Sequence, residues 1–146
     1  MTIEVSFPGG KRVDARVGKH VVHTDQPVEL GGDDTAVGPY DLFLASLVSC
    51  AGVYVLGFLQ ARNLPTEGVS LVQHVDPDPD TKLPASIRIE VRLPAGFPEK
   101  YRAAIVRAAE GCKVKKTMAA APVVQVVATV ATVAIPAGQA GDVQAT

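Results

Sequence analysis

Two cysteines, Cys50 and Cys112, are the residues of this chain whose chemistry could go beyond packing. A thiol buried among apolar groups is inert, whereas a thiolate is a nucleophile and a redox group. Cys112 opens a predicted helix beside Lys113, Lys115 and Lys116, a setting that favours a thiolate or a good leaving thiol. Cys50 falls inside a long apolar segment, where burial raises the pKa of a thiol. Two interpretations follow: an attacking and a resolving thiol in unlike settings, or two inert core cysteines.

A reactive Cys50 needs a nearby cation, because the dipole of its own helix fades within the first turn. The predicted N-terminal hairpin supplies Lys11 and Arg12 directly after a Gly-Gly turn, and Arg16 further along. Tyr54 follows Cys50 by one helical turn and either belongs to the core or lines the site. These four side chains are the candidates for the surroundings of the Cys50 sulfur.

The histidines form no metal-binding pattern. His20 and His23 stand at odd spacing in one predicted strand and point to opposite faces, and His74 adds no zinc motif. We therefore predict no metal ion and no cofactor. The net charge of −1 gives no basic field for nucleic acid. Because no basic region precedes an apolar segment at the N-terminus, we expect no signal peptide and a cytoplasmic location.

A long helix, predicted over 39–62, must hold Cys50. Pro39 suits its first position, Asp41 places a carboxylate at the positive end of the dipole, and Pro65 prevents continuation. From Leu42 to Leu59 there is no charge, and only two serines, the cysteine and Tyr54 bring heteroatoms. A helix without a polar face is buried all round. A membrane span is the alternative, but the flanks lack a basic cluster and paired aromatic residues, so we expect no membrane partner.

The remaining elements follow from the period of the apolar residues. Strands are predicted over 2–7, 11–17, 20–24, 69–75, 85–93 and 123–135, with a loop over 25–37 and further helices over 98–110 and 113–120. This order indicates an α+β fold, with antiparallel sheets packed on a long buried central helix. We expect a single domain over 1–136 and a flexible tail over 137–146.

A sheet can cover only one side of the long helix, and a chain of 146 residues has little left for the other side. The economical solution is a second copy of the chain, with the two long helices packed together in a symmetric homodimer. Gly52 and Gly57 would allow a close approach of the two helices. The sequence therefore predicts that the chain is its own partner.

Two motifs resemble the OsmC/Ohr family of thiol-dependent hydroperoxide reductases: GPYDLFLASLVSC at 38–50, and GCKV at 111–114 before the last predicted strand. The order of the predicted elements is similar too, so the resemblance covers nearly the whole chain. It implies an intertwined α+β homodimer with two active sites at the subunit interface.

The resemblance also implies roles for the two thiols. Cys50 would be the peroxidatic thiolate, which attacks a hydroperoxide and becomes a sulfenic acid. Cys112 would condense with it to an intramolecular disulfide, which an external dithiol reduces. The protein would thus be a cysteine-based peroxide reductase whose partners are a hydroperoxide substrate and a dithiol reductant.

In the organic-hydroperoxide branch of this family, an Arg from the N-terminal strands and a Glu near the start of the cysteine helix orient the thiolate. The Arg maps to the stretch that holds Lys11 and Arg12, of which we prefer Arg12. The Glu position is occupied by Tyr40, which could hydrogen-bond a substrate oxygen but cannot form an ion pair. Asp41 is next to it but about 100° further around the helix. This departure leaves an alternative open: a non-catalytic dimeric stress-response or binding protein of the same fold.

Overall fold

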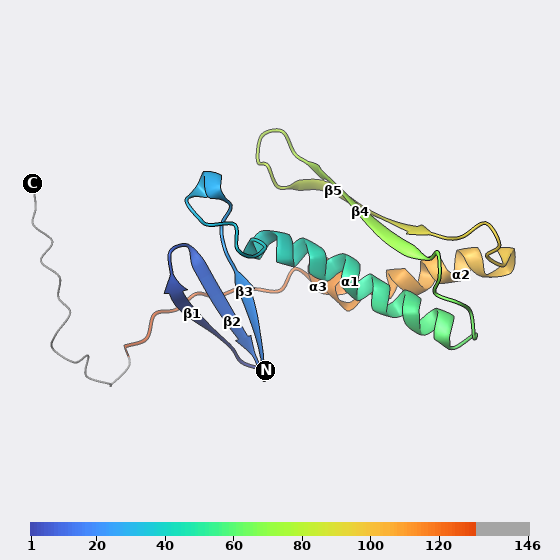
Figure 1. Cartoon of the computed structure of the whole chain (residues 1–146), viewed down its shortest axis with the longest axis horizontal. Coiled ribbons are helices and arrows are strands. Elements are labelled where there is room, and N and C mark those ends of the chain that lie inside the picture. Colours follow the sequence, from blue (N-terminus) through green and yellow to red (C-terminus); the bar gives the residue numbers. More distant parts are fainter. Residues whose placement is uncertain (131–146) are drawn as a thin grey trace, which may run out of the picture.

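The apolar segment forms one 22-residue helix, α1 (Pro39–Gln60), around which the other elements are arranged (Figure 1). The computed structural model describes residues 1–130. Gly38 is the N-cap of α1, and Pro39 occupies the first turn as the sequence predicts. Arg62 lies just beyond the C-terminal end, where its guanidinium donates to the Phe58 carbonyl at 3.2 Å and stacks on the Phe58 ring. This contact closes the last turn with a cation, which the helix dipole favours there.

The N-terminal residues form a three-stranded antiparallel sheet in the order β1–β2–β3. Its strands are β1 (Ile3–Gly9), β2 (Arg12–Val17) and β3 (His20–Thr24), close to the predicted ranges. The sheet lies at the N-terminal end of α1 (Figure 1). On it, the His23 ring pairs with Asp14 at 3.0 Å across the β2–β3 register.

A loop that contains the short 3-10 helix η1 (Val28–Leu30) joins this sheet to α1, and Asp25 organises it. The Asp25 carboxylate is 1% exposed and accepts hydrogen bonds from the backbone of Gln26, Asp33 and Thr35 and from the Thr35 hydroxyl. These bonds, with the Thr35 hydroxyl first, hold the pKa of Asp25 below its ordinary value. The loop is therefore shaped by one buried carboxylate.

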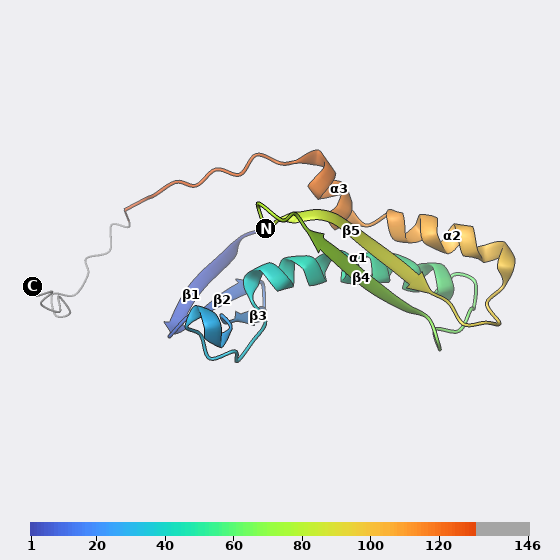
Figure 2. The same ribbon diagram turned by 90° about the horizontal axis from the view of Figure 1, so that it is seen from above.

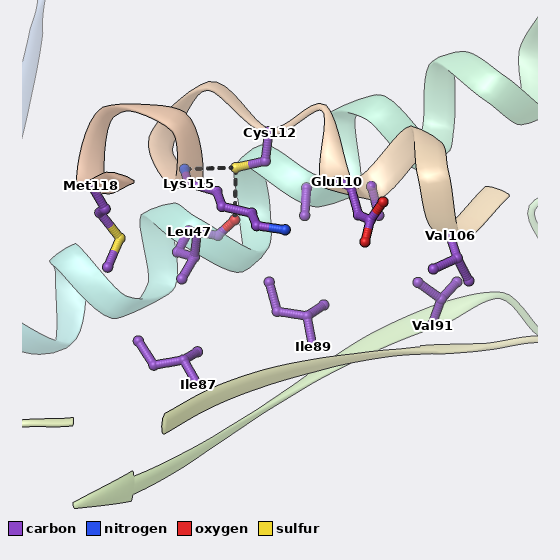
Figure 3. Close-up of a pocket in the computed structure, with 11 residues that line it drawn as sticks. Leu47, Ile87, Ile89, Val91, Val106, Glu110, Cys112, Lys115 and Met118 are labelled. Atoms are coloured by element: carbon purple, nitrogen blue, oxygen red, sulfur yellow. Dashed lines mark hydrogen bonds between the residues drawn. The ribbon is translucent and has the colours of Figure 1, made fainter. Parts of the chain in front are cut away.

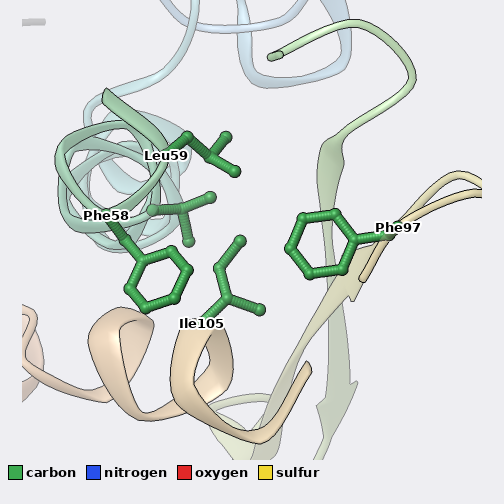
Figure 4. Packing of buried hydrophobic residues seen from close by; sticks show 5 residues of the cluster. Phe58, Leu59, Phe97 and Ile105 are labelled. Atoms are coloured by element: carbon green, nitrogen blue, oxygen red, sulfur yellow. The ribbon is translucent and has the colours of Figure 1, made fainter. Parts of the chain in front are cut away.

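The second half of the chain covers one side of α1. A hairpin of β4 (Ser70–Pro77) and β5 (Pro84–Arg92) lies along α1 in both views (Figures 1 and 2). Helix α2 (Glu99–Glu110) packs against α1 as well. The main core forms where these elements meet. Its buried residues are Val55, Phe58, Leu59, Phe97 and Ile105, of which four are labelled in Figure 4. Burial of a side chain as large as Ile105 stabilises the fold by roughly 2 kcal/mol, and Ile105 is 0% exposed.

Helix α3 (Lys113–Ala120) has the predicted bounds, but the described part of the predicted strand after it, residues 123–130, does not form a strand. Residues 121–130 have no regular secondary structure, and Val126 and Val130 are 94% and 99% exposed. A strand needs a ladder partner for its backbone groups, and in the described part of the chain none pairs with this segment. Residues 131–135 of the predicted strand and the predicted tail at 137–146 lie outside the described residues.

The prediction that α1 is buried all round is not met within one chain. Leu47, Ala51 and Val55 face the interior, whereas Val53 is 66% exposed on the opposite side. By length and composition α1 could cross a membrane, with a mean hydropathy of 2.2. Its inner side nevertheless packs against α2, α3 and β4, as a core helix does. One apolar side of α1 is left uncovered by the described residues, 1–130.

Candidate active site

Cys50 and Cys112, far apart in sequence, meet in one apolar cluster. Cys112 is 1% exposed and packs with Leu47 and Ala51 of α1. Cys50 is half-buried and packs against the same cluster. Both thiols are free. The fold thus brings together the two residues that the sequence singles out, one from the middle of α1 and one from the junction between α2 and α3.

Hydrogen bonds fix the Cys112 thiol between two helices. Its S–H donates to the Leu47 carbonyl of α1, with the sulfur 3.6 Å from the oxygen. The same sulfur accepts from the Lys115 backbone N–H at 3.5 Å and so caps the N-terminus of α3 (Figure 3). Because the contact with Leu47 uses the thiol proton, this geometry belongs to the neutral form of Cys112.

The pKa values of the two thiols are shifted in opposite directions. The pKa of Cys50 is lowered, first by the backbone N–H of Val114, then by the Cys112 thiol, and further by the backbone and charge of Lys113. These donors, at the start of α3, outweigh the effect of burial. The pKa of Cys112 is raised, chiefly because the thiol is buried. Cys50 is therefore the thiol that ionises more readily of the two.

This result reverses the expectation from the local sequence, in which the lysines after Cys112 favour a thiolate at that residue. The positive end of α3 acts on the cysteine of another helix, because the Cys112 side chain itself is buried. The cation that contributes to the lower pKa of Cys50 is Lys113, which the sequence places beside Cys112 and not among the candidates around Cys50. The signal that could have revealed it is the GCKV motif, which places backbone donors directly after the second cysteine.

The hairpin cations lie elsewhere in the single chain. Arg12 begins β2, where its guanidinium donates to the Gly9 carbonyl at 3.4 Å, and Lys11 lies in the turn near Gly31. Arg16 is exposed on the same strand. The sheet that carries them stands at the N-terminal end of α1 (Figure 1). The described contacts of Arg12 and Lys11 are thus with their own hairpin and the adjacent loop.

Three further candidates lie on α1 itself. Tyr40 is 48% exposed and stacks on Phe43, with ring centroids 6.2 Å apart. Asp41 lies in the first turn. Both are about 14 to 15 Å from Cys50 along the helix axis, from the rise of 1.5 Å per residue. Only Tyr54, one turn from Cys50, lies near the thiol pair, with its ring against Gly111 of the α2–α3 junction.

A cavity of about 340 Å³ opens beside Cys112, between α1, β5, α2 and α3 (Figure 3). Its walls are mostly aliphatic, and Glu110 and Lys115 bring the charged groups. The lining residues are Leu47, Ala51, Ile87, Ile89, Val91, Val106, Ala109, Glu110, Cys112, Lys115 and Met118. The arrangement can hold an apolar group next to the Cys112 sulfur.

The two thiols should react with an alkylating agent at different rates below pH 9. Because the pKa of Cys50 lies below the ordinary value of 9.0, its thiolate persists as the pH falls below 9.0. The pKa of Cys112 lies above that value, so Cys112 stays protonated over the same range. Iodoacetamide should label Cys50 first between about pH 7 and 9, as read by mass spectrometry of the two peptides. The urea-unfolded chain, in which both thiols should react alike, is the control; faster labelling of Cys112 in the folded protein would contradict the assignment.

Comparison with known proteins agrees with this architecture. Among solved structures, the chain is similar to an osmotic stress induced and detoxification response protein from Psychrobacter arcticus 273-4, with 22% identity, a TM-score of 0.67, and 80% of this chain and 87% of that chain covered. It is also similar to an organic hydroperoxide resistance protein OsmC from Legionella pneumophila, with 19% identity, a TM-score of 0.50, and the same two coverages of 80% and 87%. At these identities the likeness shows the fold.

The assignment to a family rests on the amino-acid sequence. No curated protein matches the chain. Residues 31–127, well over half of the chain, match the family model described as OsmC-like protein. This range contains α1, both cysteines and α3. The chain therefore belongs to the OsmC-like family, as the motifs around its two cysteines predict.

Proposed function

We propose that the protein is a thiol peroxidase in which Cys50 attacks a hydroperoxide and Cys112 resolves the product. The observation that carries this proposal is the meeting of the two thiols in one cluster with opposite pKa shifts. The description of the Legionella pneumophila protein as an organic hydroperoxide resistance protein supports the substrate class. The proposal gives each cysteine the role that its protonation state allows.

The reaction has three balanced steps. The Cys50 thiolate attacks the terminal oxygen of the hydroperoxide, the O–O bond breaks, and a sulfenic acid and an alkoxide or hydroxide form. The leaving oxygen takes up from water the proton that Cys50 released on ionisation, giving the alcohol or water. The Cys112 sulfur then attacks the Cys50 sulfur, its thiol proton joins the departing hydroxyl, and a disulfide and water form. An external dithiol finally reduces the disulfide by thiol–disulfide exchange and is itself oxidised to a disulfide.

The first step needs a stabilised thiolate, and the N-terminus of α3 supplies the donors. The backbone N–H groups of Val114 and Lys113 support the negative charge on Cys50, and the Lys113 ammonium adds to them. They act on the sulfur without a contribution from the carboxylate of Asp41 or the hydroxyl of Tyr40. In this proposal the lowered pKa of Cys50 does not depend on a carboxylate at the position of Tyr40.

We propose also that the protein works as a homodimer in the cytoplasm, with residues 1–136 as a single domain. The uncovered side of α1 supports a second copy, because the large apolar side chains of Val53 and Leu56 on it are exposed in the single chain. Monomers rarely expose an apolar face of this extent. In such a dimer the Arg12 and Lys11 hairpin of the partner would be free to approach the site.

The test is the formation of a disulfide between Cys50 and Cys112. One equivalent of tert-butyl hydroperoxide should convert the reduced protein to this disulfide, detected by peptide mapping without reduction and by loss of both titratable thiols. Dihydrolipoic acid, used as the dithiol, should restore both thiols. Protein that keeps both thiols after several equivalents of the hydroperoxide and of hydrogen peroxide would support the second candidate, a non-catalytic stress or binding protein, which the change to Tyr40 favours.

A further inference from the structure

Gly111 joins α2 to α3 and directly precedes Cys112. Its backbone is right-handed helical, with φ −64° and ψ −8°, a conformation that any residue adopts. The backbone angles therefore do not require a glycine at residue 111. The reason for a glycine must lie in the atoms packed around it.

The aromatic ring of Tyr54 occupies that space. A Cβ on Gly111 would lie 3.1 Å from Cδ1 and 3.2 Å from Cε1 of this ring, and 3.0 Å from the Ala108 carbonyl oxygen. These separations are shorter than ordinary van der Waals contact. The α2–α3 junction therefore lies against the Cδ1 and Cε1 atoms of the ring, at a residue without a side chain.

Tyr54 in turn lies one turn after Cys50 on α1, and residues four apart are neighbours on a helix surface. The ring thus links the helix that carries Cys50 to the residue before Cys112. A second link, the S–H bond from Cys112 to the Leu47 carbonyl, uses the proton that disulfide formation removes. The contact between Gly111 and Tyr54 uses no such proton and can persist while the two sulfurs join.

We propose that Tyr54 and Gly111 are positioning residues that set the approach of the Cys112 sulfur to Cys50. This inference rests on the proposed function and assigns both residues to its second step, the formation of the disulfide. The geometric reason is strict, since a disulfide requires Cα atoms within about 7 Å and Cβ atoms that point at each other. A side chain at residue 111 would push the α2–α3 junction and the Tyr54 ring of α1 apart, and Cys112 would move with the junction.

The experiment separates the two oxidation steps. Reduced protein is mixed with tert-butyl hydroperoxide. Formation of the Cys50 sulfenic acid is followed with a dimedone-type probe, and formation of the disulfide by acid quench and mass spectrometry. We expect Gly111→Val to slow the disulfide step about tenfold or more, and Gly111→Ala to slow it less. The sulfenic acid step should slow to a smaller extent than the disulfide step, because the donors at Val114 and Lys113 that act on Cys50 follow directly after residue 111.

A relief variant makes the test specific to this contact. Tyr54→Ala removes the ring, so the double variant Tyr54→Ala/Gly111→Val should form the disulfide faster than Gly111→Val alone. Gly96→Val is the matched control, because a Cβ at Gly96 meets no atom within 4 Å, and its disulfide step should match that of the wild type.

Three outcomes would overturn the inference. These are an unchanged disulfide step in Gly111→Val, no relief in the double variant, and equal slowing of both steps. If Gly111→Val does not fold, the disulfide step of Gly111→Ala, which adds a single methyl group, is compared with that of the wild type. A wild-type protein that forms no sulfenic acid at Cys50 would instead refute the proposed peroxidase, so the two failures are distinguishable.

Discussion

Cys50→Ser is expected to abolish hydroperoxide turnover, with a loss of about three orders of magnitude or more, because a serine hydroxyl is not ionised at neutral pH. The backbone donors at the start of α3 would then face a neutral oxygen in place of a thiolate. The measurement is peroxide consumption in the presence of dihydrolipoic acid, by a ferrous–xylenol orange assay. Purified Cys50→Ser should be inactive at every pH between 6 and 9.

Cys112→Ser is the matched variant for this prediction. It keeps the Cys50 nucleophile but removes the resolving thiol, so a single equivalent of hydroperoxide should be consumed and the sulfenic acid should accumulate. The first step should also slow, because Cys112 is one of the groups that lower the pKa of Cys50. Turnover of Cys50→Ser at the rate of the wild type would refute the assignment, as would a disulfide-independent activity equal in both variants.

Val53→Lys is expected to convert the proposed dimer to monomers. Val53 is 66% exposed in the single chain, so a lysine there meets water and leaves the fold of one chain intact. In a dimer built on this side of α1, the ammonium groups of both copies would be buried without partners, at a cost of several kcal/mol each. Sedimentation equilibrium should show the wild type at twice the mass of the chain, and Val53→Lys at the mass of one chain.

Val28→Lys is the control, because Val28 has the same exposure of 66% but belongs to η1 in the loop before α1. It should keep the mass of the wild type. A wild-type protein that sediments as a monomer at micromolar concentration would refute the dimer, and a Val53→Lys variant that stays dimeric would place the contact on another surface. Circular dichroism of both variants would verify that the fold is retained.

The sequence predicts local structure well where neighbouring residues decide it. Pro39 and Asp41 mark the start of α1, and the predicted helix over 113–120 has the bounds of α3. Alternating apolar residues predict β5 to within one residue at each end. The predicted strand over 123–135 is wrong for 123–130, because strand composition supplies no hydrogen-bond partner.

The sequence by itself identified the two cysteines, the apolar helix that holds one of them, and the motifs of the OsmC-like family. Each of these is a pattern of residues that are close together in the chain. Only the tertiary structure decided which thiol has the lower pKa. The charge state of Cys50 depends on backbone N–H groups of Val114 and Lys113, which the packing of α3 on α1 brings to its sulfur. The same packing buries Cys112 and raises the pKa of its thiol. A pKa reports the electrostatic surroundings in space, and for this pair those surroundings come from distant parts of the chain.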